Sequence, residues 1–128
     1  MPRDHQFAPM AERVAALNTR YDHHGATAVL EHALRDRDVG RVALVSSFGA
    51  ESVVLLHLLS VISPHTPVLF IDTQMLFAET LAYQQELAQK LYLTDIRRLS
   101  PSPASLAMGD PDGTLHQYDT DACCALRK

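Results

Sequence analysis

Two adjacent cysteines are the residues with the clearest capacity for chemistry in this chain. Cys123 and Cys124 are the only cysteines among the 128 residues. A disulfide between neighbours is disfavoured, because disulfide geometry usually needs Cα atoms at least about 4.4 Å apart. In a reducing compartment we therefore expect two thiols or two metal ligands. A zinc site shared with His116 is a weaker alternative, since no Cys-x-x-Cys pair supports it.

A hydroxyl-rich loop is the second such feature. It reads Ser46-Ser47-Phe48-Gly49-Ala50-Glu51-Ser52 and joins two apolar runs. A loop of this kind that opens a helix aims several N–H groups and the helix N-terminus at one point, which suits an anion. The alternative is a plain turn at Gly49 with Ser52 capping the helix. Neither G-x-G-x-x-G nor G-x-x-x-x-G-K-[ST] occurs, so a Rossmann dinucleotide site and a Walker-type loop are not supported.

A second loop begins at Asp72 and Thr73, at the end of the apolar run Val68 to Ile71. An aspartate in this place often makes only local turn or capping hydrogen bonds. The functional alternative is a contact to a ribose hydroxyl, or support for the first loop. In parallel α/β folds, ligands bind beyond the carboxyl ends of the strands, so both loops are candidates.

The elements that must position these residues alternate along the chain. Apolar spacing predicts helices over 9–20, 26–37, 52–63 and 77–91, a short helix near 103–108, and a last helix over 121–128. Short apolar runs predict strands over 41–46, 68–72 and 95–99. Crossover helices of this length imply parallel pairing. We therefore predict one doubly wound α/β domain over 1–128, with N-terminal helices in 1–39 and the core in 40–128.

Composition and charge disfavour several classes of function for this chain. The formal charge is −4 and no basic cluster occurs, which disfavours nucleic-acid binding. The apolar run Val53 to Ile62 is far shorter than the about 18 residues that a membrane span needs. No signal peptide is visible at the N-terminus, so we expect a cytoplasmic protein without a membrane partner.

Three motifs, in this order and spacing, resemble the assimilatory sulfonucleotide reductases. The loop from Ser47 to Ser52 resembles the modified pyrophosphatase-type loop, which reads S-G-G-x-D-S in ATP-using relatives. Ile71-Asp72-Thr73, followed by Phe77 to Tyr83, resembles the second loop and helix of that family. Asp121 to Lys128 resembles its cysteine-pair motif. The likeness runs from about residue 40 to the last residue.

The resemblance implies an adenine nucleotide α-hydrolase-like fold and a specific reaction. Such enzymes reduce adenylyl sulfate to sulfite and AMP in sulfate assimilation, toward cysteine biosynthesis, with thioredoxin or glutaredoxin as electron donor. A cysteine in the tail attacks the substrate sulfur and forms a thiosulfonate. The substrate would contact the first and the second loop. Cys123 and Cys124 would be two of the four ligands of a [4Fe-4S] cluster. Lys128 would act electrostatically near both the cluster and the substrate. The substrate-binding residues implied are Ser46, Ser47, Phe48, Gly49, Ala50, Glu51, Ser52, Asp72 and Thr73.

Departures from the family pattern bear on which reaction the chain supports. Phe48 and Glu51 replace the Gly and Asp of the ATP-using loop, which argues against ATP cleavage by an adenylating enzyme of the same superfold. Gln74 stands where many relatives have Gly. The Cys-x-x-Cys and the tail nucleophile are not among the 128 residues, so we expect the N-terminal portion of a reductase, inactive alone. A phosphoadenylyl-sulfate reductase and a non-catalytic nucleotide-binding fragment are two further hypotheses that fit the same residues.

Overall fold

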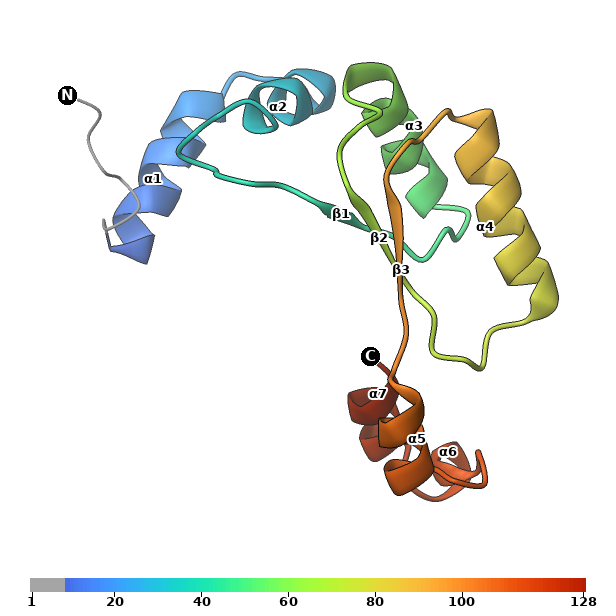
Figure 1. Cartoon of the computed structure of the whole chain (residues 1–128). Coiled ribbons are helices and arrows are strands. Elements are labelled where there is room, and N and C mark those ends of the chain that lie inside the picture. Colours follow the sequence, from blue (N-terminus) through green and yellow to red (C-terminus); the bar gives the residue numbers. More distant parts are fainter. Residues whose placement is uncertain (1–8) are drawn as a thin grey trace.

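The computed structural model describes residues 9–128, in which helices and strands alternate as expected (Figure 1). The elements in chain order are α1 (Met10–Tyr21), α2 (Ala26–Ala33), β1 (Leu44–Val45), α3 (Ser52–Ile62), β2 (Val68–Ile71), α4 (Ala78–Lys90), β3 (Ile96–Leu99), α5 (Pro103–Gly109), α6 (Leu115–Tyr118) and α7 (Thr120–Arg127). The predicted order of elements from 9 to 99 is confirmed. α6 lies in a stretch where the sequence predicts loops and a single short helix.

The three strands form one parallel sheet with β2 in the centre. Val68 of β2 lies between Leu44 of β1 and Ile96 of β3. α3 and α4 cover the same face of this sheet, as Figure 1 shows. This is the expected result when neighbouring parallel strands are joined by right-handed crossovers in sequence order. The described residues therefore confirm an α/β fold with a parallel sheet.

Two predicted elements are shorter than expected. The strand predicted over 41–46 pairs only at Leu44 and Val45, because β2 begins at Val68 and leaves the preceding residues without a neighbouring strand. The helix predicted over 26–37 ends at Ala33. Its continuation is replaced by a turn in which the backbone N–H of Asp38 donates to the Asp36 carboxylate. Aspartate side chains commonly compete with helical hydrogen bonds in this way.

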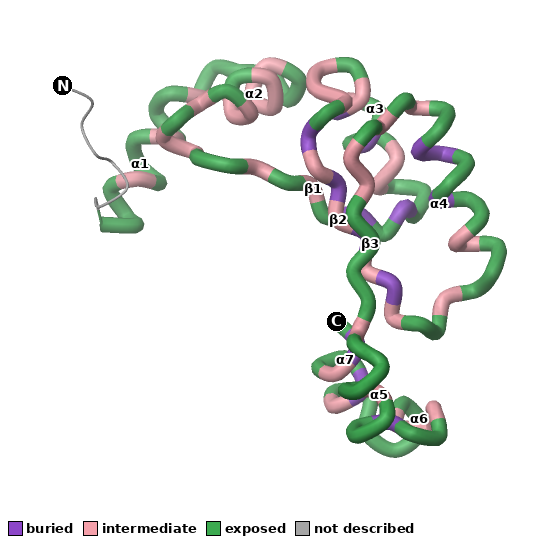
Figure 2. The backbone as a smooth tube through the Cα atoms, viewed as in Figure 1, coloured by how far each residue is buried: buried purple, intermediate pink, exposed green. Residues whose placement is uncertain are grey.

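The hydrophobic core lies between the sheet and the pair α3 and α4, where the buried segments gather in Figure 2. Side chains two apart on a strand, and three apart on a helix, share a face. Full burial of each apolar side chain contributes about 1.5–3 kcal/mol. The core is made of Phe48, Leu56, Leu59, Val68, Phe70 and Leu87. Among residues 9–128, no helix combines the length and the apolar composition that crossing a membrane requires.

Candidate functional site

The first loop is held by its own hydroxyl groups. The Ser46 hydroxyl accepts the N–H of Phe48 at 3.1 Å, and the Ser47 hydroxyl lies 3.3 Å from that of Ser52. Phe48 adopts a left-handed backbone conformation with φ of 58°. Its ring is buried and meets Phe70 edge to face. The loop is therefore anchored to the core through Phe48, while Gly49, Ala50 and Glu51 stay at the surface.

The N-terminus of α3 carries no side-chain cap. Ser52 is the first residue of the helix, and the capping position belongs to Glu51, whose side chain makes no capping hydrogen bond. The alternative in which Ser52 caps this helix is therefore wrong. Uncapped N–H groups in the first turn of an α-helix need an acceptor, and together with the helix dipole they favour an anion. This end of α3 is open to such a ligand.

The second loop is organised by Asp72, which is 1% exposed. Its Oδ1 accepts the Gln74 N–H at 2.9 Å, and its Oδ2 pairs with the guanidinium of Arg98. Burial by itself raises the pKa of Asp72, but the hydrogen bonds from Arg98 and Gln74 outweigh it and lower the pKa below its ordinary value. Gln74 has φ of 63°, a left-handed conformation that glycine adopts without strain. Both carboxylate oxygens are thus engaged by the chain itself, one in a local turn with Gln74 and the other in an ion pair with Arg98, 26 positions away.

The cysteine pair lies in α7, whose N-cap is Asp119. The Asp119 carboxylate accepts the N–H of Ala122 at 3.0 Å. Cys123 is buried and Cys124 is exposed, and both are free thiols. Successive residues of an α-helix point about 100° apart, so the two thiols face different surroundings. Lys128 follows Cys124 by one turn, and its N–H donates to the Cys124 carbonyl at 2.9 Å.

Arg127 links α7 to two other segments, to the turn after α5 through a buried ion pair and to the second loop through a hydrogen bond. Arg127 Nη2 donates to Asp110 Oδ2 at 2.6 Å, and Arg127 Nη1 donates to the Thr73 carbonyl at 2.7 Å. The Arg127 hydrogen bond lowers the pKa of Asp110, and the N–H of Leu115 adds to this effect against the opposing influence of burial. Arg127 thereby connects the cysteine helix with the second loop.

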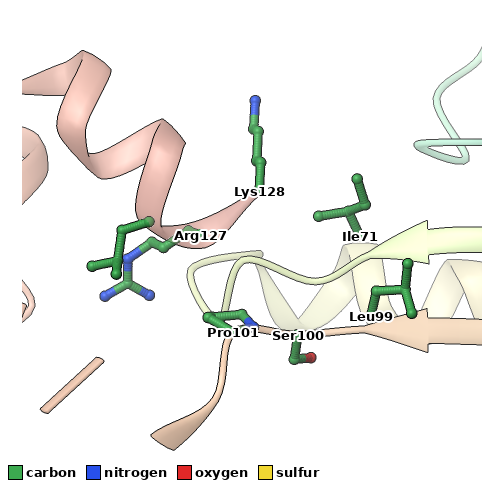
Figure 3. Close-up of a pocket in the computed structure, with 7 residues that line it drawn as sticks. Ile71, Leu99, Ser100, Pro101, Arg127 and Lys128 are labelled. Atoms are coloured by element: carbon green, nitrogen blue, oxygen red, sulfur yellow. The ribbon is translucent and has the colours of Figure 1, made fainter. Parts of the chain in front are cut away.

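These contacts bring parts of the predicted site around one cavity of about 300 Å³ at the carboxyl ends of β1 and β2. It is lined by Val45, Ser46, Ser47, Ile71, Thr73, Leu76 and Lys128. A neighbouring cavity of about 130 Å³ shares Ile71 and Lys128 with it. Figure 3 shows the Lys128 side chain standing beyond the end of α7, while the Arg127 guanidinium points the opposite way. Lys128 therefore borders both cavities.

Not every predicted site residue lies at this cavity. Ser46, Ser47, Thr73 and Lys128 line it, although Lys128 is more than eighty positions from the two serines in the sequence. Phe48 is in the core, and Asp72 is buried behind the second loop. Gly49, Ala50, Glu51, Ser52, Cys123 and Cys124 are not among its lining residues.

Sequence reasoning missed three residues that organise the site: Arg98, Asp110 and Arg127. Arg98 was visible as a charge within a predicted strand, and Arg127 as part of the cysteine motif. Their partners lie 26 and 17 positions away. No periodic signal links residues at such separations, so only the folded chain reveals these pairs.

The described residues supply part of a metal-ligand set at most. Within 9–128, no three His, Cys, Asp or Glu side chains come together in a way that could hold a metal ion. The zinc alternative with His116 is therefore not formed here. A four-iron cluster bound only by protein side chains takes four ligands, and α7 contains two free thiols, those of Cys123 and Cys124.

Comparison with known proteins agrees with the resemblance to the sulfonucleotide reductases. The phosphoadenosine phosphosulfate reductase domain matches residues 41–128. The adenosine 5'-phosphosulfate reductase of Mesorhizobium japonicum is 43% identical over 93% of this chain and 47% of its own length. That of a Chelativorans species is 44% identical over 88% of this chain and 46% of its own length. A phosphoadenosine 5'-phosphosulfate reductase of an Enterobacter species is 41% identical over 66% of this chain and 36% of its own length. The chain spans about half the length, or less, of these curated relatives.

Proposed function

The chain belongs to the phosphoadenosine phosphosulfate reductase domain family, and on this premise we propose that it binds adenosine 5'-phosphosulfate for reduction to sulfite and AMP in sulfate assimilation. The observation that carries the proposal is the joint lining of one cavity by Ser46, Ser47, Thr73 and Lys128. Hydroxyl donors, a lysine and the uncapped N-terminus of α3 form a set that suits the two negative charges of a phosphosulfate.

We assign each part of the site a role in binding. In this proposal the Ser47 hydroxyl holds the phosphosulfate, and Lys128, which lines the same cavity, neutralises it. The uncapped N-terminus of α3 adds to the site from beside Ser47, whose hydroxyl lies 3.3 Å from that of Ser52. Phe48 contributes through its backbone alone, because its ring is in the core. Asp72 supports the second loop, since both its oxygens are occupied.

The reaction that we propose is a transfer of the sulfonyl group followed by reduction. A cysteine thiolate attacks the sulfur, the S–O bond to the phosphate breaks, and AMP leaves with the bonding pair. A dithiol donor of the thioredoxin or glutaredoxin class then attacks the cysteine sulfur, releases sulfite and ends as a disulfide. The attacking cysteine is neither Cys123 nor Cys124 in this proposal, so it comes from sequence other than the 128 residues.

We propose Cys123 and Cys124 as two of the four ligands of a [4Fe-4S] cluster, the other two coming from another segment or chain. With its four thiolates the cluster would carry a net negative charge, which Lys128, one helical turn after Cys124, would partly balance. The finer fold assignment, a doubly wound sheet of the adenine nucleotide α-hydrolase type, also remains a proposal and rests on family membership. The cytoplasm, expected from the sequence, also remains a proposal.

Calorimetric titration of the 128-residue chain tests the binding. We expect adenosine 5'-phosphosulfate to bind more tightly than AMP, and Lys128→Met to remove most of the difference. Lys90→Met is the matched control, because Lys90 pairs with Glu86 on the surface of α4, away from both cavities. Equal affinity of the wild-type chain for the two nucleotides would refute the phosphosulfate site.

A sulfite-release assay with thioredoxin and its reductant tests the chemistry. We expect no sulfite from the 128-residue chain alone, because it contains no cysteine outside the proposed ligand pair. Turnover by this chain would show that one of its own two cysteines is the nucleophile.

The second candidate is reduction of the 3'-phosphorylated nucleotide, which the name of the Enterobacter relative favours. Titration with 3'-phosphoadenosine 5'-phosphosulfate separates the two. Tighter binding of the 3'-phosphorylated form would make it the preferred substrate.

A further inference from the structure

Arg127 occupies an unusual position in the structure. It forms the only ion pair within residues 9–128 in which both side chains are buried, with 7% of Arg127 and 2% of Asp110 exposed. Its other terminal nitrogen donates to the carbonyl of Thr73, 54 positions away in the chain. A single guanidinium therefore spans from the turn after α5 to the loop after β2, a task suited to its planar fork of donors.

Both acceptors of Arg127 are themselves held in place. Asp110 also accepts the N–H of Leu115 at 3.0 Å, which fixes the turn between α5 and α6. Thr73 lies between Asp72 and Gln74. Asp72 accepts hydrogen bonds from the Gln74 N–H and from Arg98, and these shape the second loop. Together with the backbone of Asp72 and Thr73, these hydrogen bonds connect β3, through the second loop, to the C-terminal helices.

The hydrogen bond from Arg127 to Thr73 is the polar connection between α7 and the loops at the strand ends. α7 packs on α5 and α6, and in the described part of the chain its one hydrogen bond to the strand-end loops is that of Arg127 to Thr73. Lys128, the next residue, borders both cavities, and Figure 3 shows it directed away from the Arg127 guanidinium. Because the two residues are adjacent, the anchor of Arg127 determines where the Lys128 side chain starts.

We infer that Arg127 is a positioning residue, which through Asp110 and Thr73 holds Lys128 at the mouth of the cavity and couples the cysteine helix to the second loop. Arg127 lines the smaller cavity, but in this proposal it does not meet the ligand, because its charge is already matched by Asp110 in the interior. The inference deepens the proposed function and rests on it only for the identity of the ligand.

A double-mutant cycle with Lys128 tests this role. Arg127→Lys keeps the charge but has no fork, and cannot hold both acceptors. We expect it to weaken binding of adenosine 5'-phosphosulfate about tenfold, because a displaced Lys128 would lose one well-placed charged hydrogen bond to the ligand. On the Lys128→Met background the same substitution should change the affinity by less than about twofold, since little coupling is left to lose. Arg97→Lys is the control, because Arg97 pairs with Asp95 on the surface and lines neither cavity.

Residue-resolved amide hydrogen exchange tests the coupling without any nucleotide. In Arg127→Met we expect exchange at Gln74 and Met75 to accelerate at least about tenfold, together with exchange throughout α7, while Phe70 in the central strand stays protected. If Arg127→Met does not fold, Arg127→Lys replaces it, with an expected smaller acceleration at the same amides.

The outcomes separate the two proposals. Equal losses of affinity from Arg127→Lys with and without Lys128 would overturn the positioning role, as would unchanged exchange at Gln74 and Met75. If the wild-type chain fails to bind adenosine 5'-phosphosulfate, the proposed function fails, and the exchange experiment alone decides whether Arg127 couples α7 to the second loop.

Discussion

The ring of Phe48 meets that of Phe70 at 86°, with centroids 5.4 Å apart, and so ties the candidate anion loop to the central strand of the sheet. Edge-to-face pairs of this kind add about 0.5–1.5 kcal/mol to the burial of the rings. Phe48 holds this position with a left-handed backbone, which L-residues with a bulky side chain seldom adopt. The packing of the ring therefore stabilises a loop conformation that the backbone alone disfavours.

Phe48→Ala should lower the free energy of unfolding by about 3–5 kcal/mol, because it removes a buried ring and leaves a cavity. Urea denaturation followed by circular dichroism measures this loss. Phe77→Ala is the control, since Phe77 is 78% exposed and its removal should change the stability by no more than about 0.5 kcal/mol. Similar losses from the two variants would contradict the anchoring role of Phe48.

Ser47→Ala should weaken the binding of adenosine 5'-phosphosulfate by about 1.5–3 kcal/mol, the usual value of a hydrogen bond to a charged ligand. Calorimetry gives the affinity of each variant. Ser60→Ala should leave it unchanged, because the Ser60 hydroxyl only donates to the His57 carbonyl within α3. If Ser47→Ala binds like the wild type, the first loop is a turn and not a binding loop.

Asp119→Ala should destabilise α7 by about 0.5–2 kcal/mol, because it deletes the side chain that caps the helix. Faster amide exchange at Ala122 and Cys123 would report the loss. Asp121→Ala removes the same charge from the first turn without removing the cap. We expect it to cost less, about 0.3–1 kcal/mol, through the helix dipole. A larger effect from Asp121→Ala would show that the dipole outweighs the cap.

Stability should fall as the pH drops below about 4, since several carboxylates have lowered pKa values in the folded chain. Hydrogen bonds from Tyr21 and then Arg20 lower the pKa of Asp36 from 3.8 to about 2. A group with a depressed folded pKa contributes stability that is fully present above its unfolded pKa and is lost as pH falls toward the folded value. The pKa values of Asp72 and Asp110 are lowered in the same direction.

Thermal melts between about pH 7 and pH 2 test this acid dependence. The Asp36→Asn variant should melt at a lower temperature than the wild type near neutral pH, and the difference should shrink toward the acid end. A difference that stays constant across this range would mean that the charge of Asp36 does not contribute.

The two thiols should differ in reactivity. Under reducing, native conditions we expect Cys124 to react rapidly with a thiol reagent and Cys123 to react at least about tenfold more slowly, because only Cys124 is exposed. Cys124→Ser should remove the fast phase, and Cys123→Ser should leave it. Loss of the fast phase in Cys123→Ser instead would contradict the burial of that residue.

Iron analysis after anaerobic reconstitution tests the ligand count. The 128-residue chain, with two cysteines, should retain no stable four-iron cluster. About four irons bound per single chain would show that other side chains complete the ligand set.

The sequence by itself determined the order of helices and strands, the two strand-end loops and the family, because these depend on apolar periodicity and on motifs of contiguous residues. It also predicted the cysteine helix over 121–128, within one residue of the observed α7 (Thr120–Arg127) at each end. Each of these features depends on residues that are close together in the chain.

Only the tertiary structure decided which residues face the ligand and which hold the site together. The sequence makes Phe48 and Asp72 candidate ligand contacts, but only the structure shows that the Phe48 ring is buried in the core and that the Asp72 carboxylate pairs with Arg98. The Arg127 bridge to Asp110 and Thr73 joins residues 17 and 54 positions apart. Such pairs form because the crossover helices and loops bring distant segments of the chain together. No pattern of neighbouring residues predicts which segments meet.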